Sequence, residues 1–164
     1  MIYRGLLKKI NFIEIYQFFG GIVGILFMSY LIFTTNVVEH KGPFYILLII
    51  PFCFFAFCIY SAWLLNKKKY LKGLNLVIIS LILQSIAFEF YGIYYTSVNG
   101  IAANFTLDLT NDIFAGFEFQ FSQFLLAFRE SETIHFKLNL IAIGMLLFVS
   151  KILKELKNSF NSII

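Results

Sequence analysis

The chain has 164 residues, of which 60% are hydrophobic and only 13% are charged; its mean hydropathy is +0.83 and its net charge is +4. An average soluble domain is about one quarter charged, so this chain holds roughly half of the charge that a water-facing surface needs. The composition therefore excludes an ordinary soluble domain and predicts an integral membrane protein. The lysines stand in short clusters beside apolar runs, which argues for topology signals and against nucleic-acid binding.

Four apolar runs predict membrane-spanning helices, at about residues 15–38, 43–65, 71–95 and 139–156. A run of about 23 residues covers roughly 34 Å, which is enough to cross a hydrocarbon core about 30 Å thick. We therefore expect a mainly α fold, with four transmembrane helices and a small antiparallel β meander between the third and the fourth. Residues 1–164 would form a single polytopic domain embedded in the lipid bilayer.

Basic residues predict the orientation of these helices. Ten of the 13 lysines and arginines lie before the first run, between the second and third runs or at the start of the third, or in and after the end of the fourth. The densest group contains Lys67, Lys68 and Lys69. Because cytoplasmic loops are enriched in lysine and arginine, we expect both termini in the cytoplasm and the helices in a bacterial inner or plasma membrane. The lysine turn and the C-terminal tail could also bind a cytoplasmic protein.

The first run carries a pattern typical of helix packing. Glu14, Gln17, Gly21 and Gly24 are spaced three, four and three residues apart and so share one helix face, and Gly20 forms a GxxxG motif with Gly24. Small residues allow helix backbones to approach closely in lipid. The pattern predicts a helix-packing seam, either between subunits or within the chain.

The third run is the most polar one. On a helix, Ser80 and Gln84 would lie on one side and Ser85 and Glu89 on the other. Such a helix is expected at the centre of an assembly, with these residues as a candidate polar lining. Glu89 is the leading functional candidate, since an intramembrane carboxylate costs a few kcal/mol. The alternative is that Glu89 lies close enough to the outer surface to reach water or a tyrosine hydroxyl.

Between about residues 97 and 137 the apolar pattern changes to alternation, which predicts strands. We expect three strands, at about residues 103–110, 116–128 and 133–138, on the exoplasmic side. The alternation slips once near Ser122 and Gln123, as a β-bulge would cause. An apolar face would need a cover from the membrane, the helix ends or another subunit. Its predicted members are Phe105, Leu107, Phe117, Phe119, Phe121, Phe124 and Phe128.

No catalytic, nucleotide-binding or redox motif is present in the sequence. The two histidines, His40 and His135, lack the spacing of a metal site, so we predict no metal, no cofactor and no enzymatic activity. The leading hypothesis is a homo-oligomer that forms a pore or channel, or that perturbs the membrane. The alternatives are a membrane sensor or anchor subunit that couples an exoplasmic signal to a cytoplasmic partner, as in a defence or stress module, and a toxin-immunity membrane protein.

Overall fold

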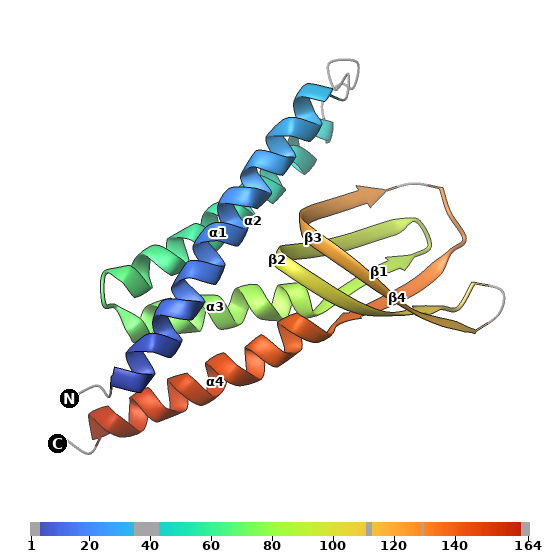
Figure 1. Ribbon diagram of the computed structural model, residues 1–164. Coiled ribbons are helices and arrows are strands. Elements are labelled where there is room, and N and C mark those ends of the chain that lie inside the picture. Colours follow the sequence, from blue (N-terminus) through green and yellow to red (C-terminus); the bar gives the residue numbers. More distant parts are fainter. Residues whose placement is uncertain (1–3, 35–42, 111–112, 129, 162–164) are drawn as a thin grey trace.

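The computed structural model describes residues 4–34, 43–110, 113–128 and 130–161 (Figure 1). Four helices are present in these ranges: α1 (Arg4–Thr34), α2 (Pro43–Asn66), α3 (Tyr70–Ser85) and α4 (Leu140–Asn161). An antiparallel sheet of four strands lies between α3 and α4 in the chain: β1 (Ile86–Phe90), β2 (Ile93–Asp108), β3 (Phe114–Phe128) and β4 (Ile134–Asn139). The expected helical content and antiparallel insert are confirmed, with four strands in place of the three predicted.

The third helix is shorter than predicted, and the sheet begins earlier. α3 ends at Ser85, and Ile86 already has the extended angles φ −129° and ψ 132°. The prediction of helix for residues 86–95 is therefore wrong. A short apolar run rich in aromatic residues suits a buried helix and a strand equally well. Here, pairing with β2 and β4 makes residues 86–90 a strand. A tight turn with positive φ at Tyr91 (44°) and Gly92 (84°) then joins β1 to β2, as in a two-residue hairpin.

Two helices are long and apolar enough to cross a membrane. They are α1 as a whole and residues Ile49–Asn66 of α2. A buried core helix of a soluble protein meets the same criteria of length and composition, and so does a signal sequence near an N-terminus. α1 begins at Arg4, so the basic lead-in and the first predicted span form one continuous helix. α3 has only 16 residues.

The sheet curls back on itself because β2 and β3 bend together. β2 pairs with β3 along one edge, while its other edge pairs first with β1 and later with β4. β1 and β4 also pair with each other. Read across, the curved sheet therefore starts with residues 124–128 of β3 and finishes with residues 114–118 of the same strand. Figure 1 shows the bend of β2 and β3 beside α1.

The predicted bulge lies at this bend. Asn99 and Gly100 of β2 stand opposite the single residue Ser122 of β3, and the register shifts between Val98 and Ile101. The extra residue belongs to β2, although the slip in alternation is visible in β3. Gly100 has φ +91°, a conformation that residues with a side chain rarely adopt. A bulge increases local twist and bends the strand, so these residues set the corner of the sheet.

Helix α4 continues directly from β4. The side-chain oxygen of Asn139, the last residue of β4, accepts a hydrogen bond of 3.1 Å from the backbone N–H of Ala142. This is an N-cap, which replaces a partner that the first helical turn lacks. The strand therefore passes into the helix without a loop, as α3 passes into β1 at the other side.

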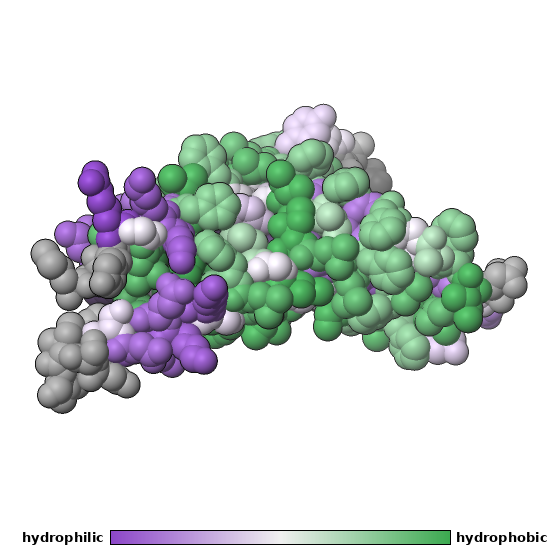
Figure 2. Space-filling view, turned by 60° about the horizontal axis from the view of Figure 1, so that its bottom comes forward, coloured by the Kyte–Doolittle hydropathy of each residue, from purple (hydrophilic) through white to green (hydrophobic). Residues whose placement is uncertain are grey.

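The basic clusters lie at one end of the molecule. The start of α1, the end of α4 and the turn between α2 and α3 are found there (Figure 1), and Lys9 of α1 lies 3.6 Å from the carboxylate of Glu155 in α4. Figure 2 shows hydrophilic residues gathered at this end and apolar side chains over most of the remaining visible surface. One hydrophobic cluster joins α1, α3 and α4 near this end, and a second joins α1 and α2 to β3.

Candidate functional site

One face of the curved sheet is polar. Residues that oppose each other in a β ladder point to the same face, and the ladders place Asn104 opposite Glu118 and Asn139, and Thr106 opposite Lys137. The side chains on this face bond to one another. Asn104 donates to Gln120 (3.0 Å), Gln120 donates to Glu118 (2.7 Å), and Lys137 donates to Glu118 (2.6 Å). We call this surface the polar face.

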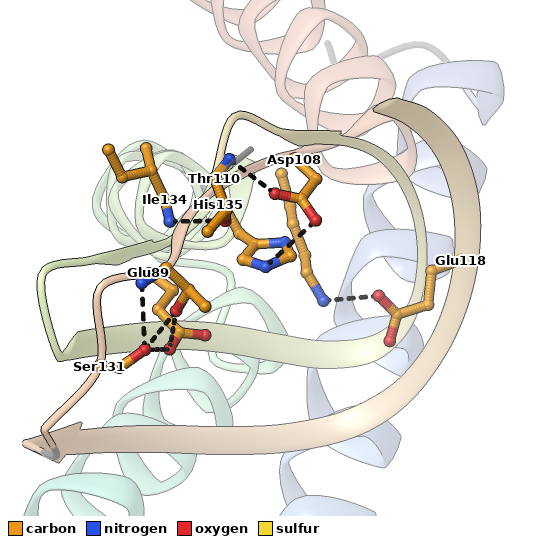
Figure 3. Close-up of polar contacts among 9 residues, drawn as sticks. Glu89, Asp108, Thr110, Glu118, Ser131, Ile134 and His135 are labelled. Atoms are coloured by element: carbon orange, nitrogen blue, oxygen red, sulfur yellow. Dashed lines mark hydrogen bonds and ion pairs between the residues drawn. The ribbon is translucent and has the colours of Figure 1, made fainter. Parts of the chain in front are cut away.

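The polar face continues to His135 and Asp108 at the far end of the hairpin. The His135 ring lies 3.6 Å from the carboxylate of Asp108. Asp108 also accepts a hydrogen bond of 2.9 Å from the backbone N–H of Thr110. Hydrogen bonds from Thr110, with a smaller contribution from the charge of His135, lower the pKa of Asp108 below its ordinary value. Figure 3 shows Asp108, His135 and Glu118 on the side enclosed by the bent strands.

Glu89 belongs to strand β1 and not to a helix, which corrects its predicted placement. It is opposite His135 in β4 and Tyr94 in β2, and only 5% of it is exposed. Its carboxylate accepts hydrogen bonds from the hydroxyl groups of Ser131 and Thr133, just before β4 (Figure 3). Glu89 therefore lies in the sheet and not on a lining helix.

A cavity of about 490 Å³ opens beside the polar face. Val23 and Phe27 of α1 form an apolar wall, and Tyr94 and residues 118–123 provide the side of the sheet. The cavity therefore places hydrogen-bonding groups next to exposed apolar side chains.

The opposite face of the sheet is apolar and falls into two parts. Phe124 is 6% exposed because it packs against Phe54 of α2 and Tyr95. In contrast, Phe117, Phe119 and Phe121 are 72–75% exposed. The ladders place all of them on one face, together with Phe105, Leu107 and Phe128, as predicted from alternation. Phe128 is also exposed, while Phe105 and Leu107 are half-buried.

Two residues predicted as a lining, Ser80 and Gln84, form a buried junction between helices and sheet with Gln17 and Asn99. Gln17 of α1 donates to the hydroxyl of Ser80 in α3 (3.2 Å) and accepts from the amide of Asn99 in β2 (3.0 Å). The side-chain oxygen of Gln84 accepts a bond of 2.8 Å from the backbone N–H of Asn99. All four are at most 2% exposed within the described chain. Ser85 bonds to the carbonyl of Leu81 in its own helix.

The seam predicted on the first helix packs within the chain. An added Cβ at Gly20 would lie 2.7 Å from the backbone nitrogen of Gly100, and one at Gly21 would lie 2.6 Å from Ile59. One at Gly24 would overlap the ring of Phe55. Glu14 accepts a hydrogen bond of 2.9 Å from Asn66 of α2. These contacts match the intrachain alternative: α1 needs small residues so that α2 and the corner of the sheet can approach.

The polar face was missed by the sequence reasoning, although a signal for it exists. Glu118, Gln120, Asn104 and Lys137 occupy the positions between the predicted apolar ones in their strands. In a soluble sheet these positions face water, and they would not attract notice. Their mutual hydrogen bonds depend on strand pairing and curvature, which alternation alone does not reveal.

The lysines that predict topology lie at the basic end, where Lys67 stands 5.9 Å from the centre of the Trp63 ring. No group of three or more metal-ligating side chains occurs among the described residues; His40 lies outside them. No family model matches this chain, and neither does a curated protein or a solved structure.

Proposed function

We propose that the protein is a non-enzymatic, homo-oligomeric membrane protein in which the curved sheet supplies a polar path for ions or other small polar solutes across part of the bilayer. The observation that carries this proposal is the inverted pattern of the sheet, with bonded polar side chains on its enclosed side and exposed phenylalanines on its outer side. Strands that are apolar outside and polar inside are typical of sheets surrounded by lipid.

The depth of the sheet supports this proposal. If Lys9 of α1 marks the cytoplasmic boundary, Gly20 lies about 16 Å deeper along the helix, near the middle of the hydrocarbon. Gly20 is the residue against which the corner of the sheet packs. The outer phenylalanines of β3 would therefore meet acyl chains rather than water.

The lengths of α3 and α4 also support a position of the sheet within the bilayer. About 13 residues separate Lys72 from the end of α3, and about 11 separate Lys151 from the start of α4, so their apolar parts cover only about 16–20 Å. In this proposal β1 and β4 complete the two crossings. Their mutual pairing starts directly beyond the helices, at Ile86 opposite Leu138, so backbone groups that leave the helices are bonded at once, as lipid requires.

Charges within this depth favour a polar path over a simple anchor. Lys137 is 16% exposed in its side chain and is held by Glu118. Ionisable residues at bilayer depth are costly and commonly mark routes for ions or substrates. The basic end supports an orientation with both termini in the cytoplasm.

Flux measurements on purified protein in liposomes test this function. We expect ion or small-solute flux from the unaltered protein, and a several-fold change in its rate or charge selectivity for Lys137→Met. Lys154→Met, which removes an exposed charge at the basic end, is the matched control and should leave flux unchanged. Absence of flux from protein that is folded and oligomeric would exclude the proposal and favour a sensor or anchor role.

A further inference from the structure

One strand of the sheet keeps a free edge. Within the described parts of the chain, β3 forms a ladder with β2 only, whereas β1, β2 and β4 each have ladder partners on both sides. Because the curved sheet both starts and finishes on β3, both of its outer edges belong to this strand. An unpaired edge presents a row of N–H and C=O groups that can pair with another strand.

This edge is long and lacks the lysine and proline residues that prevent association in soluble proteins. β3 is 15 residues long and has the sequence FAGFEFQFSQFLLAF, without lysine, arginine or proline. Its single charge, Glu118, is already bonded to Lys137 and Gln120. Natural edge strands are normally short or are protected by lysine, proline or a bulge. The outer phenylalanines beside the edge are among the most exposed apolar residues of the chain.

Lipid makes the free edge costly. An unbonded backbone group in hydrocarbon costs several kcal/mol, and open sheet edges facing lipid do not occur within a membrane. Acyl chains cannot supply hydrogen bonds, so the partner of β3 must itself offer a strand edge. In the described chain β3 is the only strand that offers one, and a second copy is therefore the fitting occupant.

We propose that β3 pairs with β3 of a second copy in an antiparallel, two-fold arrangement. A two-fold axis uses the same patch on both subunits, and it would pair the first part of β3 with the last part of its partner. Both outer edges of each curved sheet would then be satisfied at once, and the two polar faces would meet around a shared polar space. This pairing rests on the proposed function and identifies the surface through which the assembly forms.

Disulfide cross-linking of single cysteines along β3 tests the pairing. The background is Cys53→Ala with Cys58→Ala, and cysteine replaces one residue of β3 at a time in full-length protein in native membranes. In a two-fold antiparallel pair each position of β3 faces one fixed position of the partner strand, and the two residue numbers have a constant sum. Opposed residues share a face, and the apolar series of β3 passes from Phe121 to Phe124, so we expect Phe117 opposite Phe128 of the second copy if the whole strand pairs. Each of these cysteines alone should then give several-fold less dimer than the two together.

Mixtures of two variants provide a second, independent pattern. Phe117→Cys mixed with Phe128→Cys should give the mixed dimer, because these exposed positions share the apolar face and lie on opposite sides of the expected axis. Phe117→Cys mixed with Leu125→Cys, on different faces, is the matched control and should give several-fold less. Cross-linking at every position would indicate parallel strands and overturn the pairing, as would no cross-linking along β3. If flux and oligomers persist without β3 cross-links, only the pairing fails; if β3 cross-links but liposomes show no flux, the proposed function fails.

Discussion

The two halves of the β2–β3 hairpin share one alternation but have different surroundings. In the near half, residues 93–98 and 123–128, the apolar face rests on α2 and α3 around Phe124, which is almost fully buried, and becomes exposed only at its end, at Ile93 and Phe128. In the far half, residues 101–108 and 114–121, the same face carries Phe117, Phe119 and Phe121 in the open. A strand pattern thus determines that a face is apolar, and the rest of the fold determines whether the chain itself covers it.

The difference is enforced at the bulge. Asn99 and Gly100 turn the hairpin against Gly20 of α1, and Ser122 donates a hydrogen bond of 3.1 Å to the Gly20 carbonyl. Beyond this corner the strands leave the helices. Their apolar face carries phenylalanines that the described chain leaves exposed, and their polar face contains its own hydrogen bonds. The following predictions test this division between a self-sufficient half and a half that depends on its surroundings.

The largest expected effect is at Phe124. Phe124→Ala removes a buried ring packed on Phe54 and Tyr95 and should lower the free energy of unfolding by about 3–5 kcal/mol. Phe119→Ala should cost less than about 1 kcal/mol in detergent, since its side chain is exposed. Denaturation followed by tryptophan fluorescence of Trp63 measures both. Equal losses would show that the two halves are buried alike.

Gly20→Ala should strain the corner that separates the halves. The added methyl group would meet the backbone of Gly100 and the side chain of Asn99, and overpacking of this kind costs about 1–3 kcal/mol. Gly144→Ala in α4 is the matched control, because nothing lies within 4 Å of its Cβ position. That control should be neutral or slightly stabilising. A harmless Gly20→Ala would contradict the close contact between α1 and the sheet.

The hydrogen bond between Asn104 and Gln120 should contribute about 1 kcal/mol to the stability of the far half. A double-mutant cycle with Asn104→Ala and Gln120→Ala measures the coupling. Pairing Asn104→Ala with Ser85→Ala, whose hydroxyl bonds within α3, provides the control and should show additive effects. Additivity in the first pair would mean that the polar face is not a bonded unit.

The smallest effect concerns acid stability at the end of the far half. The lowered pKa of Asp108 means that the folded state favours its ionised form. This contribution is complete above the ordinary pKa of 3.8 and is lost as the pH falls through the lowered value. The thermal midpoint should therefore decrease less below about pH 4 in Asp108→Asn than in the unaltered protein. Identical acid profiles would exclude the contribution.

Several features could be predicted from the sequence because they depend on neighbouring residues. Alternation identified which side chains of β3 share the apolar face, and its slip near Ser122 located the bulge. The small and polar residues of α1 identified its packing face. Each of these patterns is a property of one segment, so no knowledge of distant contacts was needed.

The end of α3 and the position of Glu89 were not predictable in the same way. Ile86–Phe90 is an apolar segment that would suit a helix, and it becomes a strand because Phe88 pairs with Phe136 of β4 and Tyr95 of β2. The junction of Gln17, Ser80, Gln84 and Asn99 likewise joins three elements. Their polar character was visible, but their partners were not.

The sequence by itself determined the apolar composition, the basic end, the packing face of α1 and the two-sided character of the strands. Only the tertiary structure decided that β2 and β3 bend around Gly20, that polar residues meet on the enclosed side, and that β3 is left at the edge. The physical reason is that local patterns set the direction of each side chain. What lies opposite a side chain depends on backbone pairing between segments far apart in the chain.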